Sequence, residues 1–92
     1  MSDPLSRDVV ICNRRGLHAR ASAKFCALAA EQDAVIRVRK DDMEVGGCSI
    51  MGLLMLGAGK GSTITLTATG KGASAALEAL AALIENRFHE ED

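Results

Sequence analysis

Three segments of the chain show the residue pattern of a strand: residues 7–12 contain a short β-branched run, while residues 34–39 and 62–69 alternate between an apolar face and a mainly polar one. A period of two places successive side chains on opposite faces, so each segment is predicted to be a β-strand. The third segment is the most regular, because threonines separate Ile64 from Leu66 and continue on both sides. We therefore expect this strand to bury one face and to leave its threonine face in water.

Apolar residues recur at steps of three and four in residues 19–30 and 73–88, which predicts two amphipathic helices. A third, shorter helix is expected between Ser49, which suits an N-cap, and Gly57, which suits a helix C terminus. Residues 50–56 are apolar on nearly every side of this helix. Part of it must therefore lie in the core or contact a partner.

Turn-forming residues separate these elements. Residues 41–42 predict a hairpin into a short strand at residues 43–45, and residues 70–72 predict a turn before the last helix. The resulting order is β-α-β-β-α-β-α, in which a wet threonine face leaves only one sheet face for the helices. The sequence thus predicts an α+β fold, an open-faced two-layer sandwich with a four-stranded, mainly antiparallel sheet and three helices on one face. We expect one domain over residues 1–92, with a frayed tail at residues 89–92.

The charge balance argues against a partner that is recognised by bulk charge. Eleven basic and twelve acidic residues give a net charge of -1, and the chain has two Phe but no Trp or Tyr. Nucleic acids and anionic membranes both select a basic surface, and single-stranded nucleic acid also favours aromatic side chains. We therefore expect no nucleic-acid partner and no membrane association. A small RNA-binding domain is a further alternative, and saturable binding of single-stranded RNA at low salt would support it.

The three cysteines, Cys12, Cys26 and Cys48, are widely spaced among apolar neighbours and form no CxxC pair. This pattern predicts reduced core thiols without zinc or dithiol redox chemistry. We also expect no other metal site and no cofactor. The sequence also shows no secretory signal pattern and no segment near the roughly 20 apolar residues of a membrane span. The expected location is the cytoplasm.

The strongest candidate for chemistry is His18, which lies between the first predicted strand and the first predicted helix. Its imidazole should be accessible at or just before the helix N terminus, where unpaired amides and the helix dipole favour an anion. A neutral imidazole there is a nucleophile, and a phosphoryl group on its nitrogen would face the amides of Ala19 and Arg20. The Arg20 guanidinium could also contact the phosphoryl oxygens. The alternative is a polar loop residue without such a role, and spacing does not separate the two.

Two motifs, GLHAR at residues 16–20 and CSIMGLLMLG at residues 48–57, occur in that order along the chain. Together they resemble the HPr family, the histidine phosphocarriers of the bacterial phosphoenolpyruvate-dependent phosphotransferase system. The resemblance implies that phosphorylated Enzyme I donates a phosphoryl group to His18, that Arg20 supports it, and that a IIA-type protein or domain accepts it. It also implies a stoichiometric carrier rather than an enzyme, because the partners supply most of the transition-state stabilisation.

The resemblance also implies that the exposed apolar face of the short helix docks both partners, and this face maps to Ile50, Met51 and Leu54. Leu53 and Leu56 fit core packing equally well. The alternative function is a regulatory docking protein that acts through this face, with its phosphorylation state as the signal. The sugar-transport and nitrogen-related branches both retain the histidine, so the sequence does not choose between them. A monomer is the simplest expectation for so small a carrier.

Ser49 matches the serine that HPr kinase/phosphorylase modifies in some family members, and its plain alternative is a helix N-cap. A phosphate there would place charge in the docking face, so it should weaken Enzyme I binding without unfolding the domain. The chain departs from the common family pattern at Ala21, where many members have proline, and at Cys48, beside the serine. Residues 57–62 lack the full pattern of a nucleotide-binding loop and are predicted to be a flexible turn.

Overall fold

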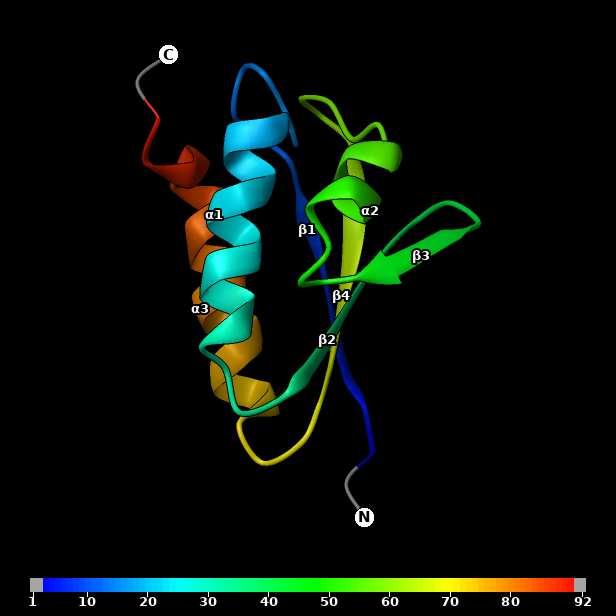
Figure 1. Cartoon of the computed structure of the whole chain (residues 1–92), viewed down its shortest axis with the longest axis vertical. Helices are drawn as coiled ribbons and strands as arrows, with labels where there is room; N and C mark the ends of the chain where they lie inside the picture. The colour runs from blue at the N-terminus through cyan, green and yellow to red at the C-terminus, as the bar shows by residue number, and fades with distance from the viewer. Residues whose placement is uncertain (1–2, 91–92) are drawn as a thin grey trace.

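The predicted order of strands and helices is confirmed by the computed structural model, which describes residues 3–90 (Figure 1). The elements are β1 (Leu5–Val10), α1 (Ala19–Ala30), β2 (Val35–Lys40), β3 (Met43–Gly46), α2 (Ile50–Met55), β4 (Thr63–Thr69), α3 (Ala73–Glu85) and the 3-10 turn η1 (Arg87–His89). Strand β1 begins and ends two residues earlier than its pattern predicts. The chain after it continues as an irregular segment, in which Ile11 N donates to Ser62 O at 2.8 Å.

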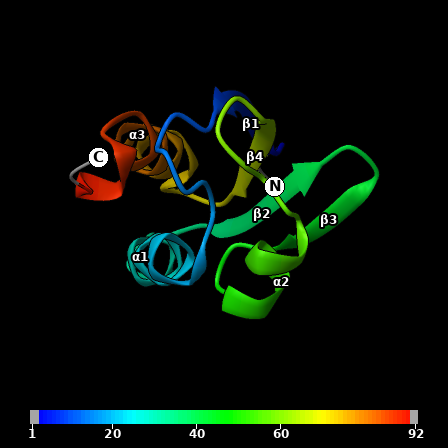
Figure 2. The same cartoon turned by 90° about the horizontal axis from the view of Figure 1, so that it is seen from above.

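The four strands pair antiparallel in the order β1-β4-β2-β3. The register places Val9 opposite Ile64 in the β1–β4 pair and Val38 opposite Leu66 in the β2–β4 pair. Since directly paired residues point to the same face of a sheet, apolar side chains of three strands meet on one side. All three helices lie on one side of the sheet in the view from above (Figure 2). The two-layer prediction is therefore confirmed.

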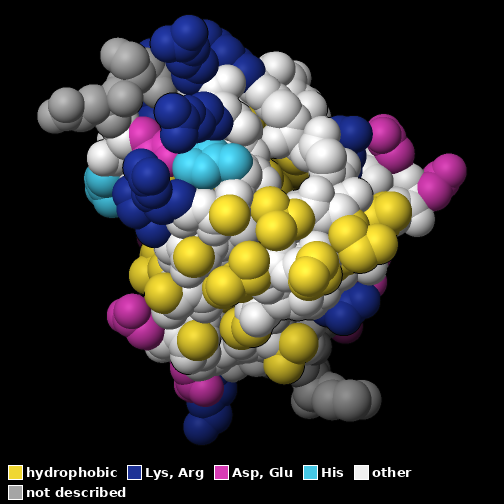
Figure 3. Space-filling view, turned by 45° about the horizontal axis from the view of Figure 1, so that its top comes forward, with side chains coloured by type: hydrophobic (Ala, Val, Ile, Leu, Met, Phe, Trp, Pro, Cys, Tyr) yellow, Lys and Arg dark blue, Asp and Glu magenta, His cyan; other side chains and the backbone are white. Residues whose placement is uncertain are grey.

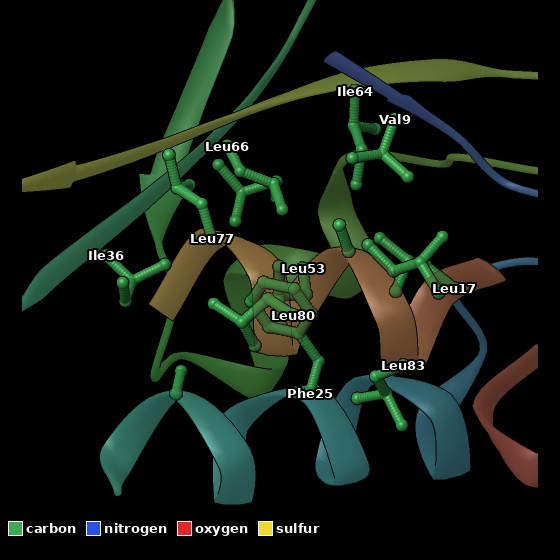
Figure 4. Packing of buried hydrophobic residues seen from close by; sticks show 14 of the residues in the cluster. Val9, Leu17, Phe25, Ile36, Leu53, Ile64, Leu66, Leu77, Leu80 and Leu83 are labelled. Atoms are coloured by element: carbon green, nitrogen blue, oxygen red, sulfur yellow. The ribbon is translucent and has the colours of Figure 1, made fainter. Parts of the chain in front are cut away.

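The core lies between the sheet and the helices (Figure 4). Ile64 and Leu66 of β4 are buried, whereas Thr63 and Thr69 at its ends are exposed, as the alternation predicts. In Figure 4 the apolar side chains of the strands point toward Phe25 and toward leucines of α2 and α3. The buried residues of α1 and α3, together with Leu53 of α2, thus pack in the core, while most of the apolar surface of α2 stays exposed.

The last helix ends earlier than its periodicity predicts. Helix α3 stops at Glu85, and residues 87–89 follow with φ between 56° and 59°, which is a left-handed turn. The turn returns Phe88 to the core, where its side chain is fully buried, and Lys24 Nζ donates to Phe88 O at 2.7 Å. The pattern located the buried Phe88 but not its backbone conformation. A left-handed turn of three non-glycine residues requires tertiary contacts to offset its cost, and these are not visible in a local pattern.

The prediction that all three cysteines lie in the core is wrong. Cys26 is buried, Cys12 is half-buried with its thiol donating to Ile84 O at 3.2 Å, and Cys48 is exposed. Cys48 is exposed because it precedes the N-cap of α2, in the turn between β3 and that helix. Burial raises the pKa of the Cys26 thiol, and the nearby Cys48 adds to this effect. All three are free thiols.

Candidate functional site

The loop that leads to His18 is held by backbone contacts to the segment before β4. Leu17 N donates to Ala58 O at 2.9 Å, and the Leu17 side chain is buried. Gly16 has a φ of +66°, and a side chain there would place its Cβ 2.5 Å from Ala58 O. Glycine is therefore required at this position both for its conformation and for the close approach. The turn predicted within residues 57–62 is present at Lys60 and Gly61, and the buried Ala58 just before it supports the His18 loop.

His18 is the N-cap residue of α1, as its position in the sequence predicts. Its backbone is extended, its N–H donates to Gly16 O at 2.9 Å, and its carbonyl accepts from Ser22 N at 2.8 Å. The His18 side chain makes no capping hydrogen bond. The amides of Ala19 and Arg20 lie in the first helical turn, where backbone N–H groups have no acceptor within the helix, and the His18 side chain does not supply one. Both residues are exposed, so this end of α1 is open to an anion.

The His18 imidazole is only partly accessible, because the C-terminal segment covers one side of it. His18 Nε2 is hydrogen-bonded to Glu90 Oε2, and the two side chains are 21% and 10% exposed. The second carboxylate oxygen, Glu90 Oε1, accepts from Asn13 Nδ2 at 2.9 Å. The predicted fraying of the tail is therefore wrong as far as Glu90, while residues 91–92 lie outside the described residues.

Asn13 connects the His18 loop to the tail. Its side chain is fully buried, and Nδ2 donates to Gly16 O at 2.8 Å in addition to the Glu90 carboxylate. Asn13 Oδ1 has no hydrogen-bond partner among residues 3–90. A buried amide oxygen without a partner costs free energy. The Asn13 amide is therefore held in this orientation by the two hydrogen bonds that its Nδ2 donates.

The surroundings of Glu90 favour its ionised form. Desolvation by burial acts to raise the pKa of this carboxyl, but hydrogen bonds from Asn13 and His18 and the nearby charges of His18 and Lys24 outweigh it. The net pKa lies below the ordinary value for glutamate. Glu90 is therefore an ionised hydrogen-bond acceptor at neutral pH.

Glu90 and Asn13 are site residues that the sequence analysis missed. Glu90 is 72 residues from His18 in the chain and belongs to an acidic terminal run, which is typical of a solvated tail. Asn13 begins the segment at residues 13–16, whose residue types are typical of an ordinary turn. The one available signal was the apolar Phe88, since a buried residue beyond the helix implies that the tail returns to the core.

Helix α2 carries an exposed apolar surface, which we call the α2 patch. Its residues, with their exposed fractions, are Ile50 (43%), Met51 (69%), Leu54 (37%) and Met55 (63%). Three of these were predicted from the sequence, and Met55 was not. Leu53 and Leu56 are buried, so the core packing proposed for them is confirmed. Figure 3 shows hydrophobic side chains over an area that borders a histidine and a group of Lys and Arg side chains.

Ser49 is the N-cap residue of α2, and this prediction is confirmed. Ser49 Oγ accepts a hydrogen bond from Gly52 N at 3.0 Å. The residue is exposed, so its hydroxyl can be reached from solvent. Modification of Ser49 stays a prediction.

Residues 3–90 contain neither a metal-binding cluster nor a membrane-spanning helix. No group of three or more His, Cys, Asp or Glu side chains in this part of the chain could hold a metal ion. None of its helices is long and apolar enough to cross a membrane.

The fold and the site define a phosphocarrier, a protein that carries a phosphoryl group between partners and is not an autonomous enzyme. Residues 5–86 match the family model described as "PTS HPr component phosphorylation site". The chain therefore belongs to the HPr family.

Known relatives cover nearly the whole chain. It is 48% identical over 86 residues to phosphocarrier protein NPr of Shewanella violacea, covering 94% of each chain. It is also 48% identical over 86 residues to phosphocarrier protein HPr of Cupriavidus necator, covering 94% of this chain and 97% of that relative. The crystal structure of HPr-C-His from Thermoanaerobacter tengcongensis superposes with a TM-score of 0.90 at 39% identity, covering 96% of this chain and 99% of that one.

Proposed function

We propose that this protein accepts a phosphoryl group on His18 from phosphorylated Enzyme I and passes it to a IIA-type protein or domain. One observation carries the proposal. His18 is the N-cap residue of α1, within the GLHAR motif of a chain that belongs to the HPr family. The two transfers would serve sugar uptake or regulation linked to the phosphotransferase system.

The chemistry requires only one nucleophilic nitrogen on this chain. A lone pair of the imidazole forms the N–P bond while the bond from phosphorus to the donor breaks, and the donor keeps that electron pair. In the onward transfer the N–P bond breaks and its electron pair returns to the ring. Between the two steps, the amides of Ala19 and Arg20 and the dipole of α1 stabilise the phosphoryl dianion. The Arg20 guanidinium, on the exposed first turn, adds a positive charge.

The α2 patch is proposed to dock both Enzyme I and the acceptor. Four exposed apolar side chains on one six-residue helix support this role, since contiguous exposed apolar surface is typical of interaction sites and methionine is enriched at interfaces. If both partners use the same patch, the carrier must leave one before it meets the other.

We infer that HPr kinase/phosphorylase can phosphorylate Ser49. The exposed hydroxyl at the N-cap of α2 supports this, because a phosphate there would be stabilised by the helix N terminus. The added charge would lie beside Ile50 and Met51, so Enzyme I binding should weaken. Purified protein treated with a cognate kinase tests the inference, and unchanged phosphoryl transfer from Enzyme I would contradict it.

A regulatory docking protein is the second candidate function. The observation that favours it is the α2 patch itself, which would serve a kinase, transporter or transcription factor equally well. The relatives do not choose between the branches, because proteins named NPr and HPr are both 48% identical to this chain. A neighbouring gene for a nitrogen-type Enzyme I would favour the nitrogen-related branch, and one for a sugar permease would favour the sugar-transport branch.

We propose that the chain works as a single domain over residues 1–92, as a monomer in the cytoplasm, without a cofactor and without nucleic-acid or membrane partners. Enzyme I draws its phosphoryl group from phosphoenolpyruvate, a cytoplasmic metabolite, which supports this location. Light scattering after size exclusion should give a mass near 9.6 kDa, whereas a mass of twice this value would indicate a dimer.

Intact-mass analysis under alkaline conditions, which preserve phosphohistidine, tests the function. The protein is incubated with a cognate Enzyme I, magnesium and phosphoenolpyruvate, beside a His18→Ala control. One added phosphoryl group that is lost in acid and absent from the control is the expected result. No modification with a demonstrably active Enzyme I would favour the docking-protein alternative.

A further inference from the structure

The Glu90 carboxylate has contacts that the proposed function does not explain. It accepts from Asn13 and is hydrogen-bonded to His18, although it comes from the opposite end of the chain. We propose that Glu90 is a positioning residue, whose carboxylate keeps the proton of the neutral His18 ring on Nε2 and leaves the Nδ1 lone pair for phosphoryl transfer. This inference rests on the proposed function of His18.

The direction of the hydrogen bond follows from the chemistry of the two groups. An ionised carboxylate can only accept hydrogen bonds, and a glutamate is ionised at neutral pH because its ordinary pKa is about 4.3; the hydrogen bond from Asn13 favours this form further. The bond between His18 Nε2 and Glu90 Oε2 therefore requires the proton on Nε2. In a neutral imidazole the other nitrogen then carries the lone pair, so Nδ1 is the nucleophile.

The position of the carboxylate is fixed from several directions. Asn13 Nδ2 donates to Glu90 Oε1 at 2.9 Å, so the second oxygen is already occupied. Two residues earlier, the buried Phe88 anchors the tail in the core, and Lys24 Nζ donates to its carbonyl at 2.7 Å. A side chain held in this way can hold the ring that it contacts, which is the usual task of a residue behind a reactive histidine.

Both phosphoryl transfers balance with the proton on Nε2. When Nδ1 forms its bond to phosphorus, the donor leaves with the electron pair of the bond that breaks, and the ring, still protonated on Nε2, becomes cationic. The Glu90 carboxylate stabilises this charge. When the phosphoryl group leaves, the electron pair of the N–P bond returns to Nδ1 and the ring is neutral again. No proton has to enter or leave the ring in either direction.

The variant Glu90→Gln distinguishes this role from mere structural support. The glutamine keeps the size of the side chain, and its oxygen can still accept from Asn13. Its amide then presents N–H to His18 Nε2, which can only accept if the ring proton moves to Nδ1. Glutamine therefore blocks the nucleophile, whereas Glu90→Ala leaves both tautomers open. A structural brace would predict the reverse, with glutamine the milder change.

The experiment measures the rate of phosphorylation by Enzyme I and phosphoenolpyruvate, together with the ¹⁵N chemical shifts of the His18 ring at a pH where it is neutral. We expect Glu90→Ala to lower the rate about tenfold and Glu90→Gln about a hundredfold. The ring should carry its proton on Nε2 in the unmodified protein and on Nδ1 in Glu90→Gln. Glu78→Gln makes the same change of charge at an exposed position of α3 and should match the unmodified protein.

The inference is overturned if Glu90→Gln is no slower than Glu90→Ala, or if the neutral ring of the unmodified protein carries its proton on Nδ1. The proposed function fails separately, if an active Enzyme I does not phosphorylate the unmodified protein. In that case the ¹⁵N shifts alone decide whether Glu90 sets the tautomer. Urea unfolding of each variant identifies any rate change that comes from loss of the fold.

Discussion

The His18 site and the α2 patch are built in opposite ways. The His18 site is polar, its ring is covered on one side, and it joins a loop after β1, the start of α1 and the segment that follows α3, with hydrogen bonds that span up to 77 residues. The α2 patch is apolar and exposed, and all of its side chains come from residues 50–55. The difference suits the two proposed tasks. Phosphoryl transfer needs one ring held in one orientation, whereas docking of successive partners needs a surface that binds and releases.

The largest expected effect comes from a change at Phe88, which anchors the C-terminal segment of the His18 site in the core. Phe88→Ala removes a fully buried aromatic side chain and should cost about 3–5 kcal/mol of unfolding free energy in urea denaturation. It should also free Glu90, so the His18 ring loses its preference for a proton on Nε2 in ¹⁵N spectra. Phe25→Ala is the matched control, because Phe25 is equally buried but lies on α1. It should be similarly destabilising and retain the tautomer, and a retained tautomer in Phe88→Ala would contradict the anchoring role.

The second largest effect is expected from a change in the α2 patch that leaves the stability of the fold nearly unchanged. Met51 is 69% exposed, so Met51→Ala should change the free energy of unfolding by less than about 0.5 kcal/mol. Enzyme I binding, measured by calorimetry, should weaken about tenfold, or roughly 1–2 kcal/mol, if this methionine is a docking contact. Met43→Ala on β3, at a residue that is 42% exposed, is the control and should bind like the unmodified protein. Equal affinities for the two variants would place the docking surface elsewhere.

Ser49 separates stability from docking within the α2 region. Ser49→Ala removes the hydrogen bond that Gly52 N donates and should cost about 1 kcal/mol of unfolding free energy. Ser49→Asp retains a capping oxygen and adds a negative charge at the helix N terminus, so its stability should stay near that of the unmodified protein. Its Enzyme I affinity should nevertheless fall, because the charge lies beside the α2 patch. An unchanged affinity in Ser49→Asp would show that charge at this position does not act on docking.

The smallest expected effect is the pH dependence of the Glu90 contact. The pKa of Glu90 is lowered in the folded protein, while in the unfolded chain it is about 4.3, so the folded state binds fewer protons in this range. The contribution of the ionised carboxylate is fully present above the unfolded value and is lost as pH falls through the lower, folded value. The difference in unfolding free energy between the unmodified protein and Glu90→Gln should therefore shrink on acidification. A difference that grows toward acid would contradict the lowered pKa.

The elements of the fold were predictable because their signals are local. The alternation of Ile64 and Leu66 with threonines, and the steps of three and four in residues 19–30, each repeat within a few residues and follow directly from strand and helix geometry. The helix starts at His18 and Ser49 were predictable for the same reason, since a cap is decided by its nearest neighbours.

The sequence by itself therefore determined the order of the elements, the sidedness of the sheet and the place of His18 at a helix start, and the family resemblance added three of the four residues of the α2 patch. Only the tertiary structure decided that Ala58 supports the His18 loop and that Cys48 is exposed. It also decided that the tail turns back in a left-handed conformation and places Glu90 on the imidazole. Periodicity is written in neighbouring residues. A hydrogen bond across 72 residues depends instead on the path of the whole backbone between its partners.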